Sequence, residues 1–152
     1  MPSSPVALDH VGISVPDLDV AVDFLSEAFG ASVLFRFDDI ADATGAVPRR
    51  LGAHPDASFS LVMLEIAGAR VELLSWTSPR TDGSIPVVDA PGGMHLGISV
   101  PDIEQSLENL RDRPDVDVIG EPLTFDSGAT AGLTNAFALT SWGLLIELLQ
   151  WP

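Results

Sequence analysis

The chain has 152 residues, 46% of them hydrophobic, which is enough to build one compact domain or two small modules that share a core. Its 22 acidic and seven basic residues give a formal net charge of −15, so nucleic acid and anionic membranes are not expected partners. Cys and Tyr are absent, which excludes disulfides, thiolate metal sites and a phenolic acid and leaves His, carboxylates and hydroxyls for chemistry.

The N-terminal segment does not look like a targeting sequence. Residues 1–5 have neither the basic region nor the apolar region of a secretory signal. No apolar run in the chain approaches the roughly 18 residues that a membrane-spanning helix needs. We therefore expect a cytoplasmic protein.

The first predicted elements are a strand and a helix. Residues 7–15 alternate between polar and apolar side chains, as in a half-buried strand, and His10 lies on the polar face. Asp17 is a favoured N-cap for a helix that continues to about Phe29, and Gly30 is suited to end it. The apolar face of the strand should pack against this helix.

Three more strands complete the first half, at residues 33–37, 59–66 and 70–76. The last two are joined by a short hairpin, so the first half has the order βαβββ. Residues 38–56, between the first two of these strands, form a long polar segment, which is either disordered or a binding loop. This segment contains Arg49 and Arg50, the only two adjacent basic residues.

The second half repeats the first. HVGISVPDL at the first strand returns as HLGISVPDI, which places His10 and His95 at matching positions. VELLSW closes the first half and IELLQW the second, which places Glu72 and Glu147 at matching positions. A period of this length indicates two homologous modules. We predict a first module at residues 1–76, a linker at 77–93 and a second βαβββ module at 94–152.

The repeated His and Glu residues indicate a metal site. Strand alternation places all four on the face of the sheets opposite the helices, where two partly buried carboxylates would repel one another. A divalent cation would resolve this repulsion, and two imidazoles with two carboxylates suit Ni, Co, Mn, Zn, Fe or Mg. The alternative is that each His is a satisfied core residue and each Glu lies at a solvated strand end. The predicted metal ligands are His10, Glu72, His95 and Glu147.

Aromatic and basic residues are the candidates for substrate contacts. The register of the second strand decides which of its side chains face the substrate: either Val33, Phe35 and Phe37, or Leu34 and Arg36. The arginine pair is suited to bidentate binding of an anionic group, but it is equally typical of a solvated surface. The candidates are Phe35, Arg49, Arg50, Trp76, Phe125 and Phe137.

With these motifs, the chain resembles the vicinal oxygen chelate superfamily over about residues 7–151. The resemblance implies an α+β fold in which tandem βαβββ modules form paired, concave mixed sheets around one divalent metal ion. The four-ligand pattern is similar to that of bacterial glyoxalase I, and the terminal ELLQWP resembles the end of methylmalonyl-CoA epimerases.

The resemblance and the predicted ligands favour a metal-dependent isomerase or lyase. Its substrate would be a small molecule with adjacent oxygens, which reacts through a metal-stabilised enediolate. Glu147 is the first choice for the catalytic base and Glu72 the second. A non-catalytic drug-sequestering protein and an Fe(II) ring-cleaving dioxygenase are the alternatives. Unpaired strand edges predict a homodimer, with the metal site either within one chain or across the interface.

Overall fold

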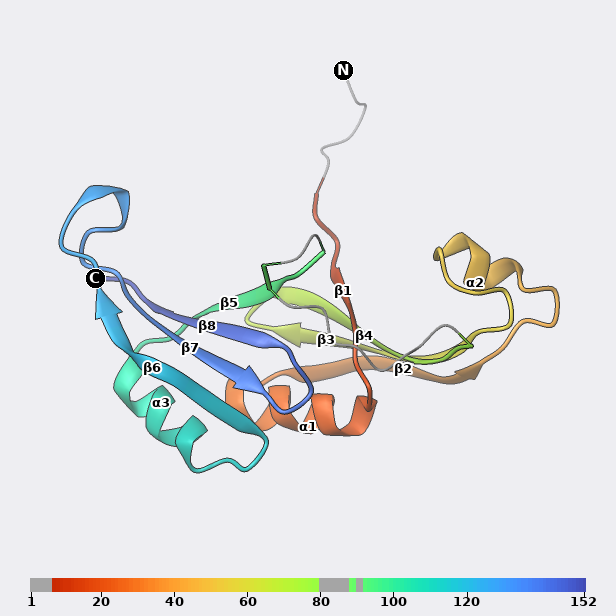
Figure 1. The fold of residues 1–152 in the computed structure, drawn as a ribbon, viewed down its shortest axis with the longest axis horizontal. Helices are drawn as coiled ribbons and strands as arrows, with labels where there is room; N and C mark the ends of the chain where they lie inside the picture. The colour runs from red at the N-terminus through yellow and green to blue at the C-terminus, as the bar shows by residue number, and fades with distance from the viewer. Residues whose placement is uncertain (1–6, 80–87, 90–91) are drawn as a thin grey trace, which may run out of the picture. The chain divides into compact units, whose positions relative to one another are not determined.

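The computed structural model describes residues 7–79, 88–89 and 92–152. The chain forms two compact units, Met1–Gly83 and Ser84–Pro152, and each contains one four-stranded mixed sheet (Figure 1). No helix in these described ranges is both long and apolar enough to cross a membrane. The repeat of the sequence therefore corresponds to a repeat of structure.

The first unit has the predicted βαβββ order with one short helix added. Its sheet order is β1-β4-β3-β2, in which β1 pairs with β4 in parallel and the other neighbours are antiparallel. The added helix lies in the polar segment between β2 and β3. The elements are β1 Val11–Ser14, α1 Leu18–Phe29, β2 Ser32–Ile40, α2 Ala46–Arg50, β3 Ser58–Ile66 and β4 Ala69–Thr77.

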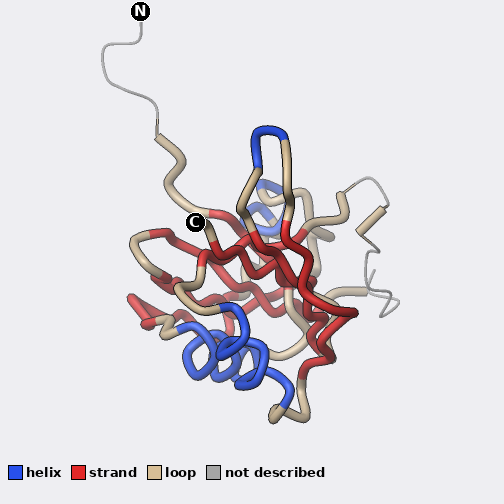
Figure 2. Tube along the Cα trace, turned by 90° about the vertical axis from the view of Figure 1, so that its left-hand side faces the viewer, coloured by secondary structure: helices blue, strands red, loops and turns tan. Residues whose placement is uncertain are grey.

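The second unit repeats this arrangement with the sheet order β5-β8-β7-β6. Its central strands β7 and β8 are antiparallel, and β5 pairs with β8 in parallel. Figure 2 separates helices from strands by colour. The elements are β5 His95–Ser99, α3 Ile103–Arg111, β6 Val116–Thr124, the 3-10 turn η1 Gly128–Thr130, β7 Thr134–Thr140 and β8 Leu145–Gln150.

The caps predicted from the sequence define the ends of α1. The Asp17 carboxylate accepts hydrogen bonds from the backbone N–H groups of Asp19 and Val20 at 2.9 and 3.1 Å. Gly30 ends the helix with a φ of 68°, a left-handed conformation that glycine adopts without steric cost. The matching Asp102 caps α3 by accepting from the Gln105 N–H at 3.0 Å.

One face of each sheet packs against the helix of its own unit. In the first unit Ile13, Leu73 and Val62 share one row across β1, β4 and β3, and all three are buried. Phe24 and Leu25 of α1 are fully buried, and α1 contacts β3 and β4 (Figure 1). The second unit buries Ile146 and Leu148 of β8 in the same way. We call the face opposite α1 or α3 the distal face of each sheet.

Shortening a core side chain should destabilise the protein strongly. Leu73 has no exposed surface, so Leu73→Ala is expected to lower the free energy of unfolding by about 2–5 kcal/mol through lost burial and a cavity. Leu8→Ala is the matched control, because Leu8 is 84% exposed. Urea unfolding measures both. Equal losses for the two variants would contradict the packing described above.

Candidate functional site

Strand alternation places Glu72 on the distal face of the first sheet. Its neighbours in β4, Val71 and Leu73, point toward α1 and are buried, so Glu72 points the other way. Across the sheet Glu72 lies between Gly12 of β1 and Met63 of β3. The Glu72 side chain is 21% exposed.

His10 lies beside Glu72 and is oriented by a carboxylate. Its Nε2 is 3.6 Å from Glu72 Oε2, while its Nδ1 is 2.7 Å from Asp9 Oδ1. The hydrogen bond with His10 lowers the pKa of the Asp9 carboxyl, and Arg70, whose Nη1 is 3.5 Å from Asp9 Oδ2, contributes to the shift. A carboxylate on Nδ1 that leaves Nε2 for a ligand is the usual environment of a metal-binding histidine.

The second sheet presents the same pair on its own distal face. His95 Nε2 is 3.3 Å from Glu147 Oε2, and the Glu147 side chain is 18% exposed. The other carboxylate oxygen, Oε1, accepts a hydrogen bond from Asn135 Nδ2 at 2.9 Å. Asn135 is not part of the sequence repeat, and only the register of β7 against β8 brings it to Glu147.

The repeated glycines leave room beside both carboxylates. A Cβ atom at Gly12 would lie 3.7 Å from Glu72 Oε2. At Gly97 it would lie 4.0 Å from Glu147 Oε2 and 3.1 Å from Leu149 Cδ1, which is tighter than most such contacts. A side chain at either glycine would therefore lie in contact with the glutamate of that pair, and at Gly97 it would also press against Leu149.

The structure shows the four predicted metal ligands as two pairs, one in each unit. Among residues 7–79, 88–89 and 92–152, no group of three or more His, Asp or Glu side chains is arranged to hold a metal ion. A pair offers one nitrogen and one oxygen donor, and protein metal sites of this donor type use three or four ligands. Convergence of the two pairs on one ion therefore stays a prediction.

Two of the predicted substrate contacts lie on the distal face of the first sheet. Phe35 pairs with Met63, the neighbour of Glu72, and its ring centroid is 5.6 Å from that of Phe37. Phe35 is 45% exposed. Trp76 also lies on this face, where its Nε1 donates to Ser14 Oγ at 3.1 Å. Met63, which lies between Phe35 and Glu72, was not predicted from the sequence as a site residue.

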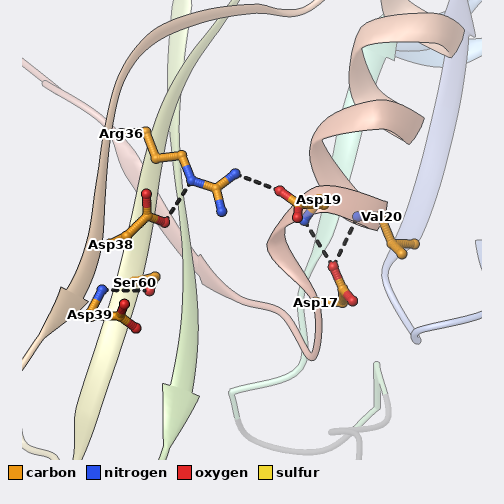
Figure 3. A network of polar contacts seen from close by, with 7 residues as sticks. All are labelled: Asp17, Asp19, Val20, Arg36, Asp38, Asp39 and Ser60. Carbon is orange, nitrogen blue, oxygen red and sulfur yellow. Dashed lines mark hydrogen bonds and ion pairs between the residues drawn. The ribbon is translucent and has the colours of Figure 1, made fainter.

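The register also removes Arg36 from the distal face. Its guanidinium donates to Asp38 at 2.7 Å through Nε and to Asp19 of α1 at 2.5 Å through Nη1 (Figure 3). These two carboxylates raise the pKa of Arg36 above its usual range. Arg36 is therefore held on the helix side, and Phe35 and Phe37 are the residues of β2 that face the other way.

Phe137 and Phe125 occupy different places in the second unit. Phe137 of β7 pairs directly with Glu147 and lies between it and Ile119 of β6, on the distal face. Phe125 follows β6 in a loop, where its N–H donates to the Leu133 carbonyl at 2.9 Å. Ile119 is 49% exposed and was not singled out from the sequence.

Arg49 and Arg50 form the last turn of α2. Arg49 Nη2 donates to the Thr44 carbonyl at 2.5 Å, which ties this arginine to its own segment. The segment that contains α2 begins after Ile40, the last residue of β2. Ile40 lies in the same row of the sheet as Trp76, which is four residues further along β4 than Glu72. The structure thus gives the polar segment a helix and brings neither arginine next to the first His–Glu pair.

Comparison with known proteins identifies the family. A model of the Glyoxalase/Bleomycin resistance protein/Dioxygenase superfamily matches residues 7–148. The chain belongs to this superfamily. Within it, the chain is 35% identical over 149 residues to a 2-epi-5-epi-valiolone epimerase from an Actinomyces species. The aligned region covers 97% of this chain and 80% of that protein.

Solved structures share the fold of this chain. A glyoxalase family protein from Bacillus cereus is 22% identical, with a TM-score of 0.76 over 99% of this chain and 97% of that one. The trypanothione-dependent glyoxalase I of Leishmania major is 24% identical, with a TM-score of 0.64 over 96% and 87%. A fosfomycin resistance protein from Listeria monocytogenes, determined with Mn(II) and sulfate, is 14% identical, with a TM-score of 0.61 over 98% and 95%. The predicted fold class is therefore confirmed.

Proposed function

We propose that the protein is a divalent-metal-dependent epimerase that acts on a small hydroxylated ketone. The observation that carries the proposal is the matched pair of His–Glu contacts, 3.6 Å in the first unit and 3.3 Å in the second, on the distal faces of two repeated sheets. The epimerase relative supports the reaction class. The intact His and Glu pattern is the reason to prefer catalysis over simple sequestration.

His10, Glu72, His95 and Glu147 would hold the ion. Two nitrogen and two oxygen donors fit Ni, Co, Mn, Zn, Fe or Mg, and the Asp9 carboxylate on His10 is the kind of partner that orients such a ligand. The bound ion would act as a Lewis acid that lowers the energy of negative charge on the substrate oxygens. Because each His–Glu pair supplies only two ligands, the two modules would share one ion.

The two glutamates are the proposed proton carriers. One carboxylate accepts the proton from the carbon next to the carbonyl, and the electron pair of the broken C–H bond moves toward the carbonyl oxygen. The glutamate of the other module, carrying a proton taken from solvent, would give that proton to the opposite side of the same carbon and so invert its configuration. Exchange with solvent would then return both groups to their starting forms. Neither an oxidant nor a second substrate is consumed. We assign proton removal to Glu147 and proton return to Glu72.

The surroundings of the glutamates favour an uncharged substrate. Met63 and Phe35 lie in the row of Glu72, and Phe137 and Ile119 lie in the row of Glu147. These apolar side chains would contact the carbon skeleton of a substrate, and they offer no partner to a phosphate or carboxylate. Arg36 is held on the opposite face of the sheet by Asp19, and Arg70, near the first pair, is 3.5 Å from Asp9.

The exposed edge of the first sheet supports a homodimer. β2 is an edge strand, and four of its apolar side chains are 43–56% exposed: Val33, Leu34, Phe35 and Phe37. An exposed apolar edge of this kind is usually covered by another chain. We propose that a second copy covers it.

Hydrogen exchange from heavy water tests the function. 2-epi-5-epi-valiolone incubated with metal-loaded protein should incorporate deuterium at the carbon next to its carbonyl, and the metal-free protein should not catalyse this exchange. NMR follows the exchange, and sedimentation of the same sample should give a dimer. Tight binding without exchange would support a sequestering protein, and oxygen uptake by an iron-loaded sample with catechols would support a dioxygenase.

A further inference from the structure

We propose that Asn135 is a positioning residue for Glu147. Its side-chain amide holds Oε1 of the carboxylate, so that Oε2 is the oxygen presented beside His95. The inference rests on the proposed function, because it assigns Oε2 to the metal and to proton transfer. It adds a residue that acts through a ligand without binding the ion or the substrate itself.

The register of the central strands creates this contact. β7 and β8 are antiparallel, with Phe137 opposite Glu147 and Asn135 opposite Leu149. Asn135 is therefore the diagonal neighbour of Glu147 on the distal face, close enough for a polar side chain to reach it. The distance from Nδ2 to Oε1 is 2.9 Å, and both residues are half-buried.

The backbone of Asn135 is held in place by the core. The next residue, Ala136, is 3% exposed, and Ala138 is fully buried on the same helix-facing side of β7. These small residues fix the strand against α3, which contacts β7. A donor on a strand anchored in this way restricts the rotamers of Glu147 more effectively than a donor on a loop would.

The described part of the first module has no hydrogen bond like that between Asn135 and Glu147, and a different polar contact is found there. Leu61 is the counterpart of Asn135, because it pairs with Leu74 as Asn135 pairs with Leu149. No residue in the described part of the chain donates a hydrogen bond to Glu72; in that module Asp9 orients the histidine instead. The counterpart of Asp9 in the second module is Met94, which carries no carboxylate. The duplicated modules thus orient different members of their His–Glu pairs.

This difference has a chemical consequence. A neutral amide donor fixes one oxygen of a carboxylate, so the second oxygen stays available to a cation. A glutamate without such a donor loses more side-chain freedom when it binds an ion. We therefore infer that the second module binds the metal with a preoriented carboxylate.

Titration of the purified full-length protein with Co(II) alone tests the inference. Asn135→Leu removes the donor while keeping similar volume, and it should weaken Co(II) binding by about 10- to 100-fold, the usual effect of losing such a partner. The visible absorption of bound Co(II) should change as well, because the ligand geometry changes. At saturating metal, kcat for deuterium exchange should fall more than KM rises.

Asn109→Asp and Asn135→Ala are the companion variants. Asn109 lies on α3, next to Gln105, and its replacement adds negative charge to the same module without touching Glu147, so Co(II) affinity should stay within about twofold of the parent protein. Asn135→Ala gives the same comparison as Asn135→Leu if the leucine prevents folding. Parent-like affinity and absorption in a folded Asn135 variant would overturn the inference.

A third comparison separates this inference from the proposed function. If the parent protein binds Co(II) and His95→Ala weakens the binding, but the Asn135 variants do not, only the role of Asn135 is wrong. If the parent protein fails to bind Co(II), the proposed metal site itself is wrong.

Discussion

His95→Ala is expected to weaken Co(II) binding by on the order of a hundred-fold or more, since the loss of a direct ligand should exceed the 10- to 100-fold effect of losing an outer partner. Alanine at His10, Glu72 or Glu147 should have an effect of the same order. The reason is that each module has only one nitrogen and one oxygen donor in its His–Glu pair, so in the proposed site neither pair would hold the ion alone. Competition with a metal chelator measures the affinities.

The chain offers matched controls for both ligand types. His54 is the remaining histidine of the chain, and its Nδ1 accepts from the Asp56 N–H at 3.2 Å within the segment that follows α2. Glu104 lies in the first turn of α3. His54→Ala and Glu104→Ala should bind Co(II) like the parent protein. Loss of metal in the variants of one module alone would show that the four residues do not share an ion.

The repeat made most of the fold predictable. Two copies of a nine-residue motif indicated the first strand and the helix cap of both modules. The alternation of polar and apolar residues in β4 and β8 indicated which faces of these strands are buried. The predicted strand at 59–66 lies within β3, and α1 begins and ends where Asp17 and Gly30 indicated. These features depend on local spacing, which the sequence displays directly.

The segment between β2 and β3 was predicted less well. β2 was expected to end at residue 37, but it continues to Ile40. Arg36 binds Asp38, and the pairing of β2 with β3 resumes at Ile40 after a register shift. Asp42 then organises α2 by accepting from the Val47 N–H at 2.9 Å and from Thr44, contacts that lower its pKa to about 2. Polar residues that satisfy one another locally are difficult to distinguish from a disordered loop by composition.

The candidate site was predictable only where it repeats. His10, Glu72, His95 and Glu147 stood out because each has a counterpart in the other module. Asn135 has none, and its hydrogen bond depends on which residue of β8 lies opposite Phe137. The sequence likewise left open whether Phe35 or Arg36 faces the site, because that choice depends on the partner strand and on the ion pair with Asp19.

Glu147→Gln is expected to slow solvent exchange of the substrate C–H by about a hundred-fold or more, the contribution of a positioned base. The glutamine keeps the length of the side chain and an oxygen for the ion, and Asn135 can still bond to its amide. Glu72→Gln should have a different effect, because the proposal assigns proton return to Glu72. That variant should incorporate deuterium while configuration is retained.

NMR in heavy water distinguishes these outcomes within one experiment. It reports exchange and inversion at the same carbon, and metal analysis of each sample shows whether a variant has lost its ion. Glu104→Gln serves as the control, since Glu104 lies on α3, which packs on the opposite face of the sheet. Parent-like exchange in both Glu147→Gln and Glu72→Gln, with metal bound, would rule out a carboxylate base. Exchange lost in Glu72→Gln but retained in Glu147→Gln would reverse their roles, because the glutamate that removes the proton is the one whose loss stops deuterium from entering.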